Sequence, residues 1–201
     1  MHWLLVPAAY GLGSVSFSLL LVRRIAQRDV REMGSGNAGA TNVLRTVGGT
    51  PALVVLVLDI LKGIVPIVLG RRLGAPAAVL GCAAVAVVCG HMYPLFHQFR
   101  GGKGVATAAG ALGALQWQLL VPCGLSFLVL VALTRYVSLA SIVAVALFPL
   151  LAWGTGPATP GGWWPALASS GIAGLTIWRH RANIERLLAR DEARLGERGG
   201  G

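Results

Sequence analysis

The stretch WLLVPAAYGLGSVSFSLLLV, residues 3–22, decides the fold class. It carries no charge and has the length, about 20 residues, that a helix needs to cross the hydrocarbon core of a membrane. No basic residue precedes it, and Arg23 and Arg24 follow it without the small-residue pattern of a cleavage site. We therefore expect a membrane span here and not a cleaved signal peptide.

The composition of the whole chain agrees with a membrane protein. The chain has 201 residues, of which 55% are hydrophobic and 12% charged, and its mean hydropathy is +0.71. Soluble domains carry about a quarter charged residues, and disorder requires low hydrophobicity, so both classes are excluded. Cys82, Cys89 and Cys123 all lie in apolar runs, which argues against disulfides and zinc. We expect one all-α membrane domain over residues 1–201.

The apolar pattern predicts further membrane helices along the chain. They are expected at residues 51–70, 76–96, 104–116, 117–133, 137–153 and 163–178. The segment 23–50 is polar and rich in glycine, and 154–162 is an uncharged turn. The arginine-rich tail, 179–201, is expected to form an interfacial helix and a flexible end.

Residues 104–133 form either one long span or a hairpin of two, and the charges decide between them. A hairpin that turns at residues 116–118 gives seven spans, with 14 cations on one side and only Arg71 and Arg72 on the other. A single span would place seven cations on the cytoplasmic side and nine outside. Because positive residues favour the cytoplasmic side, we predict seven transmembrane helices, the N-terminus outside and the C-terminus in the cytoplasm.

The stretch GSGNAGATNVLR, residues 34–45, contains a G-x-G-x-x-G pattern. No buried strand precedes it, so we reject a dinucleotide site. The glycines expose backbone amides, Ser35, Asn37, Thr41 and Asn42 add neutral hydrogen-bond donors, and Arg45 adds a bidentate cation. These groups favour a phosphate or oxyanion site over a plain turn.

The second polar stretch is GHMYPLFHQFRGGKGVAT, residues 90–107. It is not a Walker A loop, because His97 and Gly104 stand where glycine and Ser or Thr are required. A turn of Gly101, Gly102, Lys103 and Gly104 that leads into a helix nevertheless gathers amides, the positive end of the helix dipole and one cation. We expect an anion site here, and a structural, hydrogen-bonded role for His91.

Two further polar stretches lie at the same predicted face. In RYVSLAS, residues 135–141, Ser138 has the place of a helix cap, and Ser141 either faces the cavity or is structural. In the tail, His180 and Asn183 share a helix face as an i, i+3 pair and are site candidates. The tail arginines fit a helix that lies on anionic lipid.

Asp59 and Lys62 form an i, i+3 pair inside a predicted span. Charges within a membrane are functional candidates by default. Because these two neutralise each other, we favour a structural role in helix packing.

The candidate site is cationic and rich in hydrogen-bond donors. It has no pair of acid/base carboxylates, no metal-ligand cluster and no nucleophile elbow. Such a site suits two phosphate-bearing molecules and the stabilisation of developing negative charge. A transporter for phosphorylated small molecules and a lipid-binding scaffold are the alternatives. The polar motifs gather at one face of the predicted bundle, and the two halves of the sequence show no internal repeat. Both observations disfavour the transporter.

In this order, the stretches 34–45, 59–63, 90–107, 135–142 and 179–188 resemble the bacterial acyl-phosphate-dependent glycerol-3-phosphate acyltransferases over essentially the whole chain. The resemblance implies seven membrane helices and a cytoplasmic active site in the bacterial inner membrane. It implies acyl transfer from acyl phosphate to the 1-hydroxyl of glycerol 3-phosphate, giving lysophosphatidic acid and phosphate in the first committed step of phospholipid synthesis. It implies no acyl-CoA, no metal and no cofactor, and as a possible partner the soluble enzyme that makes acyl phosphate; nucleic acid is not expected.

The resemblance also implies roles for individual residues. The expected catalytic residues are Ser35, Arg45, Lys103, His180 and Asn183. The expected substrate-binding residues are Asn37, Thr41, Gly101, Gly102, Gly104 and Ser141. The general base is either His180 or a substrate phosphate oxygen, and the tail beyond Ala189, with Asp191 and Glu192, departs from the family pattern.

Overall fold

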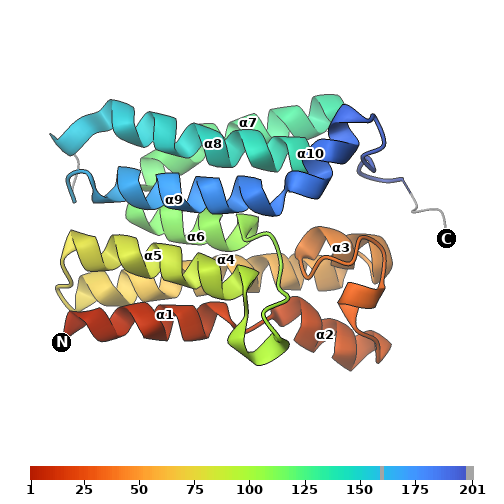
Figure 1. Cartoon of the computed structure of the whole chain (residues 1–201), viewed down its shortest axis with the longest axis horizontal. Coiled ribbons are helices and arrows are strands. Elements are labelled where there is room, and N and C mark those ends of the chain that lie inside the picture. Colours follow the sequence, from red (N-terminus) through yellow and green to blue (C-terminus); the bar gives the residue numbers. More distant parts are fainter. Residues whose placement is uncertain (159–160, 198–201) are drawn as a thin grey trace.

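The computed structural model describes residues 1–158 and 161–197, and all regular elements within these ranges are helices. The α-helices of Figure 1 are α1 (Leu5–Gly13), α2 (Phe17–Ala26), α3 (Ala40–Thr46), α4 (Gly49–Arg72), α5 (Ala77–Met92), α6 (Val105–Leu115), α7 (Trp117–Thr134), α8 (Val137–Thr155), α9 (Trp164–Arg179) and α10 (Arg181–Leu188). Short 3-10 helices occupy His2–Leu4, Val30–Glu32, Leu95–His97 and Gly156–Ala158. Arg198, with the rest of the expected flexible end, lies outside the described residues.

Five helical segments are long and apolar enough to cross a membrane. They are His2–Ala26, Gly49–Arg72, Ala77–His97, Trp117–Thr134 and Val137–Thr155. The helix α6 is apolar but shorter, and α9 has 16 residues. The all-helical fold and its apolar helices therefore confirm the class of membrane helix bundle, while seven spans stay a prediction.

The expected span at residues 3–22 is not one helix. α1 ends at Gly13 and α2 begins at Phe17, so the chain breaks within the apolar stretch. Ser14 donates its hydroxyl to the carbonyl of Tyr10 (2.9 Å), and the Nζ of Lys62 donates to the carbonyl of Val15 (2.9 Å). The break is stable because a buried cation from α4 satisfies a carbonyl that the helix leaves free.

The bundle has two layers of helices, with α6 between them (Figure 1). α1, α2, α4 and α5 form one layer, α7, α8 and α9 form the other, and α6 contacts helices of both. A Cβ on Gly110 would stand 2.1 Å from the carbonyl oxygen of Ile60, and one on Gly63 would stand 2.3 Å from that of Thr107. These glycines allow α4 and α6 to pack backbone against backbone.

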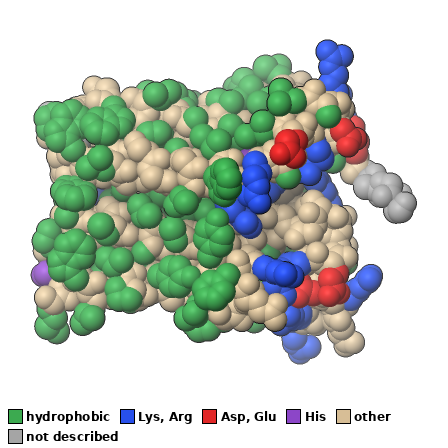
Figure 2. Space-filling model, viewed as in Figure 1, with side chains coloured by type: hydrophobic (Ala, Val, Ile, Leu, Met, Phe, Trp, Pro, Cys, Tyr) green, Lys and Arg blue, Asp and Glu red, His purple; other side chains and the backbone are tan. Residues whose placement is uncertain are grey.

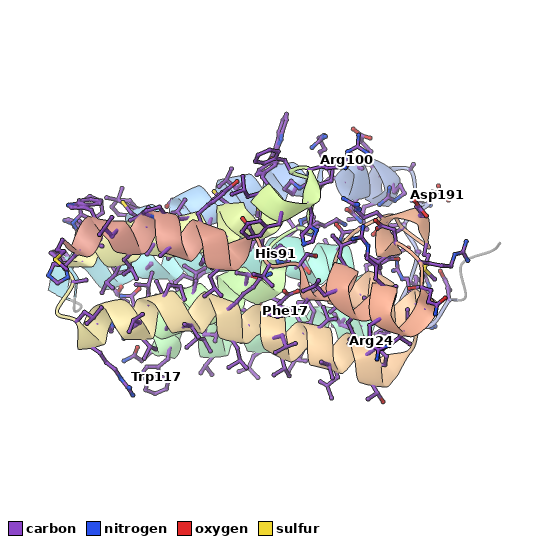
Figure 3. All side chains as sticks on the ribbon, turned by 90° about the horizontal axis from the view of Figure 1, so that it is seen from below. Phe17, Arg24, His91, Arg100, Trp117 and Asp191 are labelled. Atoms are coloured by element: carbon purple, nitrogen blue, oxygen red, sulfur yellow. The ribbon has the colours of Figure 1, made fainter. Side chains whose placement is uncertain are left out.

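Residues 104–133 form two helices, α6 and α7, that meet at Gln116, as the charge pattern predicts. Trp117 marks one end of the bundle, and Arg24, Arg100 and Asp191 lie toward the other (Figure 3). α7 is peripheral, since only 6% of its apolar window is buried, whereas the core forms around the other helices.

Charge divides the surface into two regions. Within the described residues, every Lys and Arg except Lys62, Arg71 and Arg72 lies in the segments 23–48, 93–104, 134–136 and 179–197. We call the end that these segments form the cationic end; Figure 2 shows its blue and red side chains at one side of the molecule. Exposed hydrophobic side chains cover the rest of the visible face, as expected for a surface in contact with lipid.

Candidate active site

A cavity of about 1400 Å³ opens at the cationic end and extends between the helices. Arg45 and Lys103 line the same space, so the two motifs that the sequence separates by 58 residues meet here. Of the eleven predicted site residues, nine line this cavity: Ser35, Asn37, Thr41, Arg45, Lys103, Gly104, Ser141, His180 and Asn183. Gly101 lines a smaller adjoining pocket, and Gly102 is not among the lining residues of either.

The first motif is organised by Asn42, which the sequence predicts only as a further neutral donor beside Ser35, Asn37 and Thr41, and not as a site residue. Its buried side chain accepts from the amide of Ser35 (2.9 Å) and donates to the carbonyls of Val30 (3.0 Å) and Met33 (2.9 Å). Gly34 has a φ of +53°, and a Cβ there would stand 2.5 Å from the Oδ1 of Asn42. The Ser35 amide is therefore occupied, and the hydroxyl is the donor that Ser35 can still offer a ligand.

The glycine loop differs from expectation at two positions. The amide of Gly101 donates to the carbonyl of Met92 (3.2 Å), and that of Gly102 donates to the carbonyl of His91 (3.2 Å). Arg179 in turn donates to the carbonyls of both glycines. The expectation that these amides are free for a ligand is wrong, because the chain must turn tightly against α5: a Cβ on Gly102 would stand 2.3 Å from the Nε2 of His91.

The free amides lie one turn further on, at the start of α6. Gly104 takes a φ of +82° and is the N-cap residue, so the helix begins at Val105, two residues after Lys103. In the described part of the chain, the amides of Val105, Ala106 and Thr107 have no protein acceptor, as is usual in the first turn of a helix. Because Gly104, Val105 and Ala106 line the cavity, this helix start is suited to an anion.

Lys103 and Arg45 bring positive charge to the helix start. The Nζ of Lys103 donates to the Oδ1 of Asn183 (2.5 Å). Burial, followed by the charges of Arg186 and Arg45, lowers the pKa of Lys103 to about 8, so the side chain is still mostly charged at pH 7. Arg45 donates to the carbonyl of Ala193 (3.2 Å), and its buried Nε has no partner among the described residues.

His180 lies buried between α9 and α10. Its Nδ1 is 2.8 Å from the carbonyl oxygen of Thr176. Because a carbonyl only accepts, Nδ1 carries the proton, and Nε2 keeps a lone pair. Burial and the nearby charge of Lys103 lower the pKa of His180 to about 4, so the ring is neutral at pH 7.

Glu192, in the tail that departs from the family pattern, fixes the last motif. Its Oε1 accepts from Asn183 (2.6 Å), and its Oε2 accepts from the Nε of Arg186 (2.8 Å). Burial raises the pKa of this carboxyl, but the nearby hydroxyl of Ser138 and the two hydrogen bonds outweigh burial and leave the pKa below its usual value. The signal in the sequence is an acidic residue within an arginine-rich tail.

Two other predictions concern Ser141 and the pair of Asp59 and Lys62. Ser141 lines the cavity and donates its hydroxyl to the carbonyl of Val137 (2.7 Å), so only its lone pairs are free. Lys62 and Asp59 are 2.8 Å apart and both almost fully buried, and the Nδ1 of His91 is 3.6 Å from the same carboxylate oxygen. With the bond from Lys62 to Val15, this cluster ties α4 to α5 and to the break between α1 and α2.

The cavity has a polar and an apolar part, and the buried Asp59 and His91 also line it. Its polar part, which we call the cup, is bounded by Ser35, Arg45, Lys103, His180 and Asn183. Its apolar part, which we call the groove, lies between α4, α6, α7 and α8 and includes Leu56, Leu112, Leu120 and Phe148. The two parts form one continuous space, suited to a molecule with a charged head and a hydrocarbon tail.

A family model described as glycerol-3-phosphate acyltransferase matches residues 3–190. The chain belongs to the glycerol-3-phosphate acyltransferase family. It is 42% identical to the glycerol-3-phosphate acyltransferase of Halalkalibacterium halodurans over 98% of this chain and 97% of that protein. It is 45% identical to that of Pseudomonas aeruginosa over 94% of this chain and 97% of the relative.

Solved structures agree with this assignment. The chain resembles PlsY, an integral membrane glycerol 3-phosphate acyltransferase, in its glycerol 3-phosphate form, with a TM-score of 0.90, 39% identity and coverage of 97% of this chain and 96% of that one. The lysophosphatidic acid form of PlsY gives a TM-score of 0.86 at 38% identity, covering 97% and 95%. The predicted family is therefore confirmed, and this member of the glycerol-3-phosphate acyltransferase family is a membrane protein.

Proposed function

We propose that the chain, as one membrane domain, transfers an acyl group from acyl phosphate to the 1-hydroxyl of glycerol 3-phosphate. The products are lysophosphatidic acid and phosphate, and the reaction is the first committed step of phospholipid synthesis. The observation that carries the proposal is the continuous cavity, in which a cup with Arg45, Lys103 and a helix start leads into an apolar groove. PlsY in its glycerol 3-phosphate and lysophosphatidic acid forms supports the acceptor and the product.

The phosphate of the donor is assigned to the start of α6, beside Lys103 and Gly104, with its acyl chain in the groove. Glycerol 3-phosphate is assigned to Arg45, His180 and Asn183, and the hydroxyl of Ser35 polarises the acyl carbonyl. Asn37, Thr41 and Ser141 complete the polar wall, while Gly101 and Gly102 act by shaping the turn. Acyl phosphate is already activated, so positioning and charge stabilisation supply most of the catalysis.

In the reaction, the 1-hydroxyl oxygen forms a bond to the carbonyl carbon, and the bond from that carbon to the phosphate oxygen breaks. The hydroxyl proton leaves with the phosphate. The low pKa of His180 supports a phosphate oxygen as the proton acceptor, since a group with a pKa of about 4 is a weak base at pH 7. The Nε2 of His180 instead accepts a hydrogen bond from the attacking hydroxyl and orients it.

A pH–rate profile of His180→Asn separates these roles. If His180 only orients the hydroxyl, the variant loses rate by a similar factor at every pH. If the acidic limb of the wild-type profile is absent from the profile of the variant, His180 is the base.

We further propose seven membrane spans, with α1 and α2 together as the first. The cationic end faces the cytoplasm of a bacterial inner membrane, because positive residues concentrate on that side. This orientation gives the cup access to glycerol 3-phosphate and to acyl phosphate from the soluble enzyme that makes it.

The decisive experiment uses the purified protein in detergent with labelled glycerol 3-phosphate and a chelator. Acyl phosphate and acyl-CoA are offered separately, and we expect lysophosphatidic acid only from acyl phosphate. Product from acyl-CoA alone would contradict the proposed donor.

Lys103→Met and Arg45→Ala test the cup. We expect each to lower kcat/KM by about 10²-fold or more, because each removes a charge that faces a phosphate. Arg72→Ala, at the opposite end of the bundle, is the matched control and should retain activity. Uptake of glycerol 3-phosphate into sealed vesicles without product would instead favour the transporter hypothesis.

A further inference from the structure

The groove is open along one side of the bundle. Leu56 on α4 and Leu128 on α7 both line the cavity, and they are 39% and 63% exposed. These residues form opposite rims, so the groove opens between α4 and α7 toward the surface that lipid covers. Its inner wall is formed by α6 and α8, where Leu112 and Phe148 are each 2% exposed.

Gly124 on α7 lies in the wall of this groove. A Cβ built at this position meets no atom within 4 Å. Gly63 and Gly110 differ, because a Cβ there would collide with the backbone of a neighbouring helix at 2.3 and 2.1 Å. Helix packing therefore does not require a glycine at position 124, although a glycine inside a helix costs about 1 kcal/mol relative to alanine.

The position of Gly124 along α7 divides the groove. It lies ten residues before Thr134, where α7 ends at the cationic end. At about 1.5 Å of rise per residue, that is about 15 Å from the polar end of the helix. Leu120, one turn deeper, also lines the groove, so a side chain at position 124 would lie between the cup and the deepest part.

We propose that Gly124 determines the length of acyl chain that this protein accepts, by keeping the deep part of the groove open to long chains. The inference rests on the proposed function, since it takes the groove as the site of the acyl chain. A leucine at position 124 would fill the space that the distal carbons of a long chain occupy. The shorter part of the groove, between position 124 and the cup, would remain available to a short chain.

The test compares Gly124→Leu with the wild type on octanoyl, dodecanoyl and octadecanoyl phosphate. We expect kcat/KM for octadecanoyl phosphate to fall by about 10- to 200-fold, the range that a changed hydrophobic pocket commonly produces. Activity on octanoyl phosphate should stay within about twofold of the wild type. An unchanged ratio of the long-chain to the short-chain kcat/KM would overturn the proposal.

Gly174→Leu is the matched control. Gly174 is also a helical glycine with no atom within 4 Å of its Cβ position, but it is exposed, lies on α9 and does not line the cavity. This variant should keep the chain-length profile of the wild type. A shift in its profile equal to that of Gly124→Leu would also overturn the proposal. Gly124→Ala should shift the profile less than Gly124→Leu does. It serves as the test if Gly124→Leu unfolds at too low a temperature to be assayed.

A binding measurement separates this inference from the proposed function. The thermal stabilisation by octanoyl and octadecanoyl lysophosphatidic acid is measured for the wild type and both leucine variants. If the wild type uses no acyl phosphate, the proposed donor is wrong, but binding still decides the role of Gly124. Selective loss of stabilisation by the octadecanoyl lipid in Gly124→Leu supports the proposal, and equal stabilisation in all three proteins overturns it.

Discussion

Lys103 differs from the arginines of the cationic end in that its charge depends on pH near neutrality. Burial, with the charges of Arg186 and Arg45, lowers its pKa to about 8, so the ammonium is present below that pH and lost above it. We expect kcat/KM to fall above about pH 8, because kcat/KM reports the ionisation of the free enzyme. The limb in kcat should lie at higher pH, since bound phosphates favour the charged form.

Lys103→Arg is the control for this prediction, because a guanidinium stays charged throughout the range. Whatever its overall activity, the variant should lose the limb near pH 8. A limb that persists in the variant would assign the titration to another group.

The pair of Asp59 and Lys62 gives a second prediction at the residue scale. Lys62→Met leaves a buried carboxylate without its nearest cation and leaves the carbonyl of Val15 without a donor. We expect the variant to lose about 3–5 kcal/mol of stability, measured as unfolding in detergent. If the role is structural, Asp59→Leu with Lys62→Met should recover part of that loss and keep the kcat of the wild type. A double variant that is stable but inactive would contradict a structural role.

Single residues also mark how far the sequence predicts the site. Arg45, Lys103, His180 and Asn183 stand out because few polar residues occur in so apolar a chain, and the structure brings them together. Their roles stay predictions. The occupied amides of Gly101 and Gly102 were not predictable, since their acceptors are carbonyls at the end of α5 that only the folded turn places nearby.

At the scale of elements, α6 is the helix on which the site depends. Its start presents free amides to the cup, and its flank packs on α4 through Gly110. Gly110→Val would place atoms against the carbonyl of Ile60, so we expect about 1–3 kcal/mol of destabilisation, which lowers the melting temperature by several degrees. Activity should fall together with stability, because the valine side chain displaces α6.

Gly171→Val is the matched control for α6, since the nearest atom to a Cβ at Gly171 is a side-chain carbon of Val85 at 3.9 Å. Its melting temperature should stay near that of the wild type. Equal melting temperatures for the two valine variants would show that α4 and α6 do not pack as described.

The sequence predicts helices unequally well. The turn at Gln116 was predictable, because polar residues mark positions 116–118 and the count of cations on the two sides favours a hairpin. The break between Gly13 and Phe17 was not, because it occurs in an uninterrupted apolar stretch. The stabilising donor, Lys62, lies 47 residues away in the chain. Elements that polarity and charge mark in the sequence are therefore predictable, and those fixed by tertiary contacts are not.

For the whole molecule, the orientation that we propose in the membrane rests on the cationic end. Cysteine labelling tests it in a background with alanine at Cys82, Cys89 and Cys123. An impermeant maleimide applied to intact cells should label Gln118→Cys, next to the turn before α7, and should leave Ala189→Cys unlabelled until the membrane is opened. Both positions are exposed. Labelling of Ala189→Cys in intact cells would reverse the proposed orientation.

The continuity of cup and groove has a consequence for where the two reactants meet. In the proposed reaction, glycerol 3-phosphate and the hydrocarbon tail of the acyl donor need different surroundings, and the cup and the groove provide one for each. A lipid assembled there already has its headgroup at the aqueous boundary and its tail among hydrocarbon. It can diffuse sideways into the surrounding leaflet without crossing water and without turning over.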